Sequence, residues 1–339
     1  MLLLGRGWRA VAERGPAMND PGGLPGGADR FLRAHCEGGM RALHGAGSNR
    51  RFWRTEAGVL SHTPDGAELR RIIDIGGALH EAGVPVPALI AWDRRAGLAL
   101  HEDVGDDSLL SVARGHLGPA GAAPPPDPLP GGTLDRRALV GYEAALDALA
   151  ELQKVTLPSA ALPPFSRDDL RWETWYGITH HFFGVLGRRN RGSGVDEALE
   201  DLSATLFDGP QTTMHRDYQS TNLHIGRDNA VAILDWAGMR RGPAAYDLAS
   251  LLWDPYVEMS APERASLLAG WKGTALDERL LKATVVQRLF QALGAFAYLS
   301  RHCARPNFAH FAVPAMRLLR TVVDPWPALE VFVEASAER

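Results

Sequence analysis

The stretch that decides the fold is MHRDYQSTNLHIGRDNAVAILDWAGMRRGPAAYDLASLL, residues 214–252. Two short runs within it, residues 222–226 and 231–235, have the apolar content typical of strands. Residues 227–230 between them, Arg-Asp-Asn-Ala, are mostly polar and indicate a turn. We therefore predict one β-hairpin in this part of the chain.

Three oxygen-bearing side chains lie around this hairpin. The expected register places Asn222 directly opposite Asp235, so that two oxygen donors meet at one open end. Asp217 lies on the preceding loop, five residues before Asn222. Carboxylate and amide oxygens suit Mg²⁺ rather than zinc, so this group predicts a magnesium site.

The loop before the hairpin also follows a catalytic pattern. The run from His215 to Asp217, followed after four residues by Asn222, fits H-R-D-x-x-x-x-N at every fixed position. In this pattern Asp217 accepts or orients the proton of an attacking hydroxyl, and Asn222 and Asp235 hold Mg²⁺ on nucleotide phosphates. We expect structural roles for His215, which would brace the loop, and for Asp247, which would hydrogen-bond it.

The region before this stretch is predicted to form a small mixed lobe over residues 29–103. Apolar spacing predicts a helix at 67–81. A helix is also expected at 29–40, and strands are expected on both sides of the turn at 44–49, in a second hairpin, and at 88–92 and 98–102. This arrangement predicts an antiparallel sheet with one main helix.

A hinge and a Pro/Gly-rich loop, residues 104–133, separate this lobe from a helical one at 134–330. Residues 331–339 form a tail. We expect residues 1–28 to be disordered, with Met18 as an alternative start, because Gly and Pro give them little to pack. From Leu134 onward the pattern is mostly helical, with Leu139, Leu146, Leu149 and Leu152 on one apolar face. Further helices are predicted at 171–186, 195–206, 246–256, 262–271, 277–303 and 307–322.

Composition excludes several classes of protein. The 339 residues include 36 basic and 40 acidic side chains, a near balance that gives no electrostatic basis for binding nucleic acid or an anionic membrane. No apolar stretch approaches the roughly 20 residues of a membrane span. The 2 cysteines lie far apart, which excludes a disulfide framework and favours a cytoplasmic protein.

The sequence resembles the aminoglycoside phosphotransferase-like branch of the protein-kinase-like fold over residues 30–330. Within that branch it is most similar to the anomeric N-acetylmuramate and N-acetylglucosamine kinases of cell-wall recycling. Besides the catalytic loop, the resemblance is carried by Ser48-x-Arg50-Arg51-Phe52-x-Arg54, Gly83-Val84-Pro85-Val86-Pro87, Glu102-Asp103-Val104-Gly105, Asp235-Trp236, Gly242-Pro243-x-x-Tyr246-Asp247-Leu248, and Val286-Gln287-Arg288 to Gly294-x-Phe296. It implies a bilobal α+β fold with a small antiparallel-sheet lobe and a larger, mainly helical lobe.

A nucleotide site is expected in the smaller lobe. Backbone amides of a Gly-rich turn can approach phosphates, and the hinge backbone from Glu102 to Val104 would meet the adenine. The turn residues concerned are Gly45, Gly47, Ser48 and Asn49.

One departure from the wider kinase pattern concerns lysine. The only lysines are Lys154, Lys272 and Lys282, so the smaller lobe has none to contact the phosphates. Arg51 or Arg54 on the preceding strand is the expected substitute, because a guanidinium can bind phosphate through its fork.

The acceptor site is less well marked. Aromatic side chains stack on sugar faces, so Trp175, Tyr176 and His180 are candidates to border a sugar. Arg288 joins them through the late-helix motif of the resemblance.

The function predicted from these features is phosphorylation of a small-molecule hydroxyl with ATP or GTP and Mg²⁺. The expected acceptor is an amino sugar at its anomeric hydroxyl. An antibiotic-type phosphotransferase and a nucleotide-binding regulator without turnover are the alternatives. Oligomeric state, the identity of the acceptor and the choice between ATP and GTP stay open.

Overall fold

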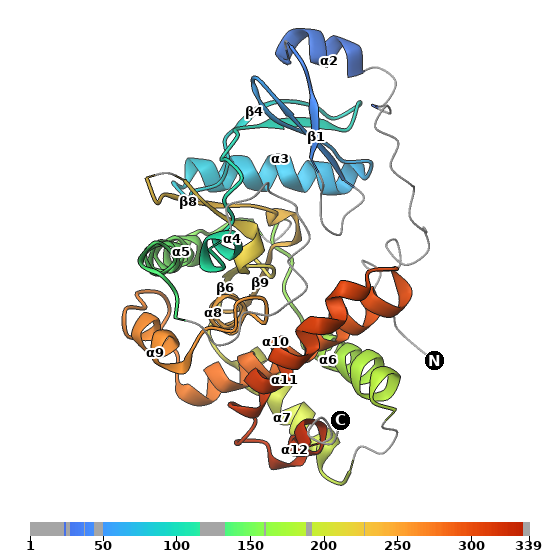
Figure 1. Ribbon diagram of the computed structural model, residues 1–339, viewed down its shortest axis with the longest axis vertical. Coiled ribbons are helices and arrows are strands. Elements are labelled where there is room, and N and C mark those ends of the chain that lie inside the picture. Colours follow the sequence, from blue (N-terminus) through green and yellow to red (C-terminus); the bar gives the residue numbers. More distant parts are fainter. Residues whose placement is uncertain are drawn as a thin grey trace.

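The computed structural model describes residue 24 and residues 28–36, 38–43, 50–115, 133–158, 161–187, 192–226 and 228–334. Most of the expected N-terminal extension, the turn at 44–49 and most of the Pro/Gly-rich loop lie outside the described residues. The described part forms a smaller lobe of sheet and helix above a larger helical lobe (Figure 1).

The smaller lobe is built on a five-stranded antiparallel sheet of order β1-β2-β3-β5-β4. Alternation along the strands gives the sheet two apolar faces. One face carries Trp53 and Leu60 against Phe31, and the other carries Ala99 against Leu69. The elements are α2 (Ala28–His35), β1 (Arg41–Leu43), β2 (Arg51–Thr55), β3 (Gly58–His62), α3 (Gly66–Glu81), β4 (Leu89–Asp93) and β5 (Leu98–His101).

Helix α3 follows its prediction closely, whereas α2 is shorter than expected. Asp65 caps α3 by accepting hydrogen bonds from the amides of Ala67 and Glu68 at 2.7 and 3.2 Å. The expected helix at 29–40 ends instead at His35. Gly38, with φ of 84°, follows shortly afterwards, and a helix cannot continue through that left-handed conformation.

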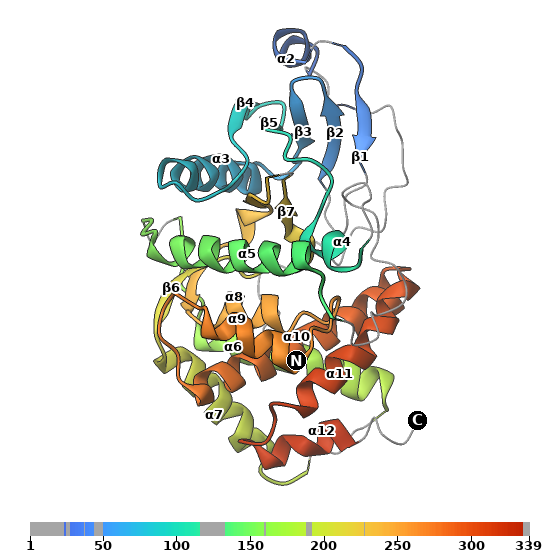
Figure 2. The ribbon, with the colours of Figure 1, turned by 60° about the vertical axis from the view of Figure 1, so that its left-hand side comes forward.

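The larger lobe contains the long helices and the main hydrophobic core (Figures 1 and 2). The expected helix at 171–186 is two elements, because the α-helical turn widens to a π-helix after Gly177. The helical elements are α4 (Leu109–Ala113), α5 (Arg136–Lys154), α6 (Arg167–Gly177), the π-helix η1 (Ile178–Val185), α7 (Val195–Asp208), η2 (Ser220–Asn222), η3 (Trp236–Gly238), α8 (Tyr246–Leu252), α9 (Ala261–Ala269), α10 (Glu278–His302), η4 (Pro306–Phe311), α11 (Ala312–Arg320), η5 (Pro327–Leu329) and α12 (Glu330–Glu334).

Helices α6 and α10 cross at close range. A Cβ atom added to Gly177 would lie 2.2 Å from the carbonyl oxygen of Phe290, and one added to Gly294 would lie 2.6 Å from the ring of Tyr176. The two backbones can therefore approach only because these positions have no side chain.

The predicted hairpin is present as β7 (Leu223–Ile225) and β8 (Val231–Ile233), but its register differs from the expectation. Asn222 lies opposite Leu234, whose amide donates to its carbonyl at 2.8 Å, and not opposite Asp235. The amide of Gly226 bonds to the carbonyl of Ala230, and this tighter turn shifts the pairing by one residue.

A second two-stranded sheet corrects the expectation of a single hairpin in this lobe. Strand β6 (Gln211–Met214) pairs with β9 (Arg240–Pro243), so the catalytic-pattern loop and the hairpin lie between two paired strands. The hairpin itself is tied to the hinge and the smaller lobe. The amide of Ile225 donates to the carbonyl of Asp107, and that of Ile233 donates to Pro85, both at 2.7 Å.

Helix α3 also connects the lobes. Arg71 donates to three backbone carbonyl oxygens, those of Ala237, Ala161 and Met239, at 2.7, 2.8 and 2.7 Å. The described residues include no helix long and apolar enough to cross a bilayer.

Candidate active site

The loop of residues 215–222 joins β6 to the hairpin and presents Asp217 at the surface. The side-chain amide of Asn222 donates to the carbonyl of Asp217 at 2.9 Å, which closes the loop on itself. A Cβ atom on Gly238 would lie 3.8 Å from the Asp217 carboxylate. The segment that follows β8 therefore passes beside Asp217.

Asp235 begins that segment in an unusual backbone conformation. Its φ and ψ of 63° and 48° are left-handed, which non-glycine residues seldom adopt. The next residue, Trp236, is buried and donates its indole N–H to the carbonyl of Ile72 in α3 at 2.9 Å. The structure thus brings Asp217, Asn222 and Asp235 to the same end of the hairpin.

A buried carboxylate supports the loop from below. Asp247, 2% exposed, accepts hydrogen bonds from the backbone amides of His215 and Arg216 at 2.6 and 2.9 Å. Burial raises the pKa of Asp247, while His215 and the two amides act in the opposite direction. The ring of His215 is fully buried and lies edge-on to Tyr218, with 5.7 Å between ring centroids.

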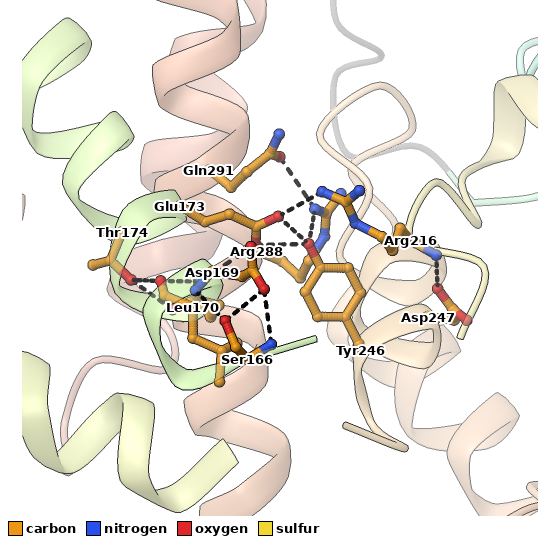
Figure 3. A network of polar contacts seen from close by, with 11 residues as sticks. Ser166, Asp169, Leu170, Glu173, Thr174, Arg216, Tyr246, Asp247, Arg288 and Gln291 are labelled. Atoms are coloured by element: carbon orange, nitrogen blue, oxygen red, sulfur yellow. Dashed lines mark hydrogen bonds and ion pairs between the residues drawn. The ribbon is translucent and has the colours of Figure 1, made fainter. Parts of the chain in front are cut away.

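Arg216 extends this support into a buried polar network between α6, α8 and α10 (Figure 3). Its guanidinium lies 3.3 Å from Glu173, whose carboxylate also accepts from the hydroxyl of Tyr246 at 2.8 Å. Arg288 donates to the same hydroxyl at 2.7 Å. Burial acts to lower the pKa of both arginines, but Glu173, Tyr246 and Asp217 together raise it above its ordinary value.

The four acceptor-site candidates do not form one group. Arg288 belongs to the network just described. Tyr176 and His180 lie together, 4.6 Å between ring centroids, in an aromatic cluster with Tyr298. Trp175 lies elsewhere and lines a separate cavity of about 330 Å³ with residues of α6 and α7.

Of the nucleotide-site candidates, the structure describes the two hinge residues and the two arginines of the smaller lobe. Gly45, Gly47, Ser48 and Asn49 lie outside the described residues. Glu102 and Val104 are in the hinge, where the amide of Glu102 donates to the carbonyl of Ala88 at 2.9 Å.

The two arginines expected to take the place of the missing lysine lie in different surroundings. Arg54 forms ion pairs with Asp103 and Asp106 of the hinge, at 2.5 and 2.7 Å. Arg51 shares a sheet face with Trp53, two residues along the strand, and that face packs against α2.

Two residues that sequence reasoning did not single out lie at the site. Arg50 places a guanidinium nitrogen 2.6 Å from a carboxylate oxygen of Asp235 and another 3.4 Å from Glu68 in α3. A usable signal was strand alternation, since Arg50 is in phase with Phe52 and out of phase with the core residue Trp53.

Comparison with known proteins shows which family the sequence matches. The model described as "Phosphotransferase enzyme family" matches residues 39–282. An N-acetylmuramate/N-acetylglucosamine kinase of Pseudomonas aeruginosa is 29% identical over 312 residues, covering 86% of this chain and 85% of the relative. The protein of the same name from Caulobacter vibrioides is 27% identical over 283 residues, covering 75% and 70%.

Solved structures share the fold at low identity. The gentamicin complex of APH(2″)-IIa has a TM-score of 0.61 at 12% identity and covers 88% of this chain and 99% of its own. A choline/ethanolamine kinase family protein from Mesorhizobium loti has a TM-score of 0.58 at 14% identity, with coverages of 91% and 95%. The predicted bilobal α+β fold and the predicted family resemblance are confirmed.

Proposed function

Because this chain belongs to the phosphotransferase enzyme family, with ATP as the phosphoryl donor and a small-molecule hydroxyl as acceptor, we propose that it is an amino-sugar kinase. The acceptor that we propose is N-acetylmuramate or N-acetylglucosamine, phosphorylated at the anomeric hydroxyl. The observation that carries the transfer chemistry is the meeting of Asp217, Asn222 and Asp235 at one end of the β7–β8 hairpin.

In the proposed reaction the anomeric hydroxyl oxygen of the sugar attacks the γ-phosphorus of ATP, and Asp217 accepts the proton of that hydroxyl. A new P–O bond forms to the sugar, and the bond between the γ-phosphorus and the β–γ bridging oxygen breaks to release ADP. Asp247 contributes indirectly, because its two backbone hydrogen bonds fix the loop that carries Asp217.

The donor set suits magnesium. Asn222 uses its amide nitrogen on the carbonyl of Asp217, which leaves its amide oxygen for a ligand beside the carboxylate of Asp235. The described residues contain no group of three or more His, Cys, Asp and Glu side chains that could hold a metal, so water and phosphate oxygens would complete the shell. When bound, Mg²⁺ neutralises phosphate charge, and Asn222 and Asp235 would hold it.

For the nucleotide, we propose that the adenine meets the hinge backbone from Glu102 to Val104. The hinge is well suited to fix a ligand because it is held from two sides. Arg54 binds Asp103 and Asp106 from β2, and the ring of His224 contacts the carbonyl of Gly105 at 2.9 Å from β7. The backbone amides of Gly45, Gly47, Ser48 and Asn49 are proposed to face the phosphates.

The amino-sugar assignment is supported by the names of the relatives and by the state of the acidic side chains. An antibiotic polycation would need unpaired carboxylates on the helical lobe. Two acidic residues of α7 are engaged instead, since Glu200 binds Arg171 and Arg167, and Asp201 accepts from the indole of Trp326. This pairing disfavours the aminoglycoside alternative.

The test is a kinase assay with Mg-ATP across N-acetylmuramate, N-acetylglucosamine, choline and aminoglycosides. We expect turnover with the two amino sugars and loss of their reducing end, since an anomeric phosphate blocks it. Asp217→Asn should lower kcat by about 10² or more while ATP still binds, and Asp228→Asn, at the exposed hairpin turn, should leave kcat unchanged.

The same assay can refute the proposal. Preferred turnover of an aminoglycoside or of choline would refute the amino-sugar acceptor. ATP binding without turnover of any acceptor would favour the regulator. A product that keeps its reducing end would place the phosphate on another hydroxyl.

A further inference from the structure

The cation that normally contacts ATP phosphates in this fold has no counterpart at its usual strand position. Strand β3 reads Gly58-Val59-Leu60-Ser61-His62 and contains no lysine or arginine. The three lysines are all in the larger lobe, where each pairs with a carboxylate: Lys154 with Glu151, Lys272 with Asp147 and Lys282 with Asp324.

Arg50 lies beside Asp235, one of the proposed magnesium ligands. One guanidinium nitrogen, Nη2, is 2.6 Å from Oδ1 of Asp235, and Nε is 3.4 Å from Oε1 of Glu68. The side chain is only 11% exposed and packs over the ring of Phe52, 5.4 Å from its centroid. Three elements therefore fix its position: β2, α3 and the segment after β8.

We propose that Arg50, positioned by Glu68, takes the place of the strand lysine and binds the β- and γ-phosphates of ATP. This inference rests on the proposed function and assigns its phosphate-binding residue. Arg50 is not a lysine-to-arginine exchange at one position, because it precedes β2, whereas the usual lysine lies on β3.

The charges around Arg50 give the physical reason. Burial raises the pKa of Glu68, Arg50 acts to lower it, and the negative charge of the nearby Asp235 adds to the rise. Without Arg50, two carboxylates would face an incoming triphosphate. A guanidinium has five N–H donors, so Arg50 can keep Glu68 on Nε while its Nη groups, one of which contacts Asp235, also donate to phosphate oxygens.

The neighbouring arginines provide a discriminating comparison. Arg54 is held by two hinge carboxylates. Arg51 lies on the opposite face of the sheet beside His62, whose pKa is lowered by burial and by the charge of Arg51. An unselective loss of positive charge would affect all three positions. If Arg50 is the phosphate-binding residue, only its substitution should weaken ATP binding.

The experiment measures the Kd of Mg-ATP by calorimetry, together with kcat and the KM for each substrate, in full-length Arg50→Gln, Arg50→Lys, Glu68→Gln and Arg51→Gln. For Arg50→Gln we expect the Kd and the KM for ATP to rise roughly tenfold or more, with the acceptor KM within about twofold of wild type. Arg50→Lys should restore part of the affinity, and Glu68→Gln should weaken it by about threefold. Arg51→Gln should match wild type.

Folding of each variant is checked by its thermal transition. Wild-type ATP affinity in folded Arg50→Gln overturns the proposal, as does a loss in Arg51→Gln that equals or exceeds the loss in Arg50→Gln. If Arg50→Gln does not fold, the decision rests on Glu68→Gln and Arg50→Lys, and wild-type affinity in both overturns it. A wild-type protein that binds ATP but phosphorylates no amino sugar refutes the acceptor and still tests Arg50, whereas one that binds no ATP refutes both.

Discussion

A single buried carboxylate holds two consecutive amides of the 215–222 loop, and the second of them belongs to a residue in a costly conformation. Arg216 has a φ of 78°, which typically costs a non-glycine residue about 1 kcal/mol or more. The two hydrogen bonds that Asp247 accepts offset this cost and fix the direction in which Asp217 leaves the loop.

Asp247→Ala should therefore lower the free energy of unfolding by about 3 kcal/mol, because two amides lose their acceptor in a buried place. It should also lower kcat about tenfold or more, since Asp217 would no longer be held in position. Urea unfolding and steady-state kinetics measure the two effects. Asp228→Ala, which removes one exposed turn hydrogen bond, is the control, and a stable, active Asp247→Ala protein would contradict this role.

His181 gives a prediction about pH. Its side chain is 4% exposed in the π-helix, and burial lowers its pKa to about 4. Between pH 6.5 and about 4 the unfolded chain takes up a proton at His181 that the folded protein does not, so stability must fall as the pH falls. Above pH 6.5 this residue causes no pH dependence.

We expect His181→Gln to be less sensitive to acid than wild type over that interval, by at most about 3 kcal/mol. Denaturant unfolding at pH 7, 6, 5 and 4.5 measures the slope for both proteins. Equal slopes would show that His181 protonates freely in the folded state.

The candidate catalytic side chains could be singled out from the sequence because they lie close together along the chain. Asp217, Asn222 and Asp235 lie within 20 residues and their types specify the chemistry. Arg50 was not predicted, since its partner Asp235 is 185 residues away and only the folded chain brings them together. Arg51 and Arg54 carry the same guanidinium group as Arg50, but they lie in different surroundings.

Among the elements, α3 carries most of the connection between the lobes. Its Glu68 faces Arg50 and its Ile72 accepts the indole of Trp236. At Gly76 a Cβ atom would lie 2.8 Å from the ring of Trp236, whereas nothing lies within 4 Å of a Cβ atom at Gly77. A side chain at position 76 would therefore clash with Trp236, whereas position 77 has room for one.

Gly76→Ala and Gly77→Ala form a matched pair. Gly77→Ala should raise the free energy of unfolding by about 0.8 kcal/mol through helix propensity, with unchanged kcat. Gly76→Ala should lower it and reduce kcat, because Trp236 must move and Asp235 is the residue before it. Chemical denaturation and kinetics test both, and equal effects of the two substitutions would argue against a tight contact.

Elements were predictable where one local pattern decided them. Helix α3 has regular apolar spacing, a capping Asp65 and a terminating Gly83, and it begins one residue before the predicted start. The β6–β9 pair was missed because its two four-residue strands are far apart along the chain and share no turn. The one-residue register error of the hairpin came from the turn, whose length the sequence does not specify.

At the scale of the whole molecule, Arg71 is the strongest polar connection between the lobes that we identify. Its guanidinium donates three hydrogen bonds to carbonyl oxygens of the larger lobe and of the segment after Asp235. Such contacts make the two lobes unfold together.

Arg71→Gln should lower overall stability by about 2 kcal/mol or more and broaden the thermal transition toward two steps. Arg70→Gln, at the adjacent exposed position, should stay within about 0.5 kcal/mol of wild type. Differential scanning calorimetry distinguishes the cases. One sharp, unshifted transition in Arg71→Gln would mean that apolar packing alone couples the lobes.

The placement of lysines has a practical consequence for chemical labelling. Reagents that carry an activated acyl group on ATP tag kinases by acylating a lysine amine next to the bound phosphates. Here the only lysine amines belong to Lys154, Lys272 and Lys282, and each is paired with a carboxylate in the helical lobe. A guanidinium at position 50 does not acylate under the same conditions, so a proteome survey with such a reagent would miss this protein even while it binds nucleotide.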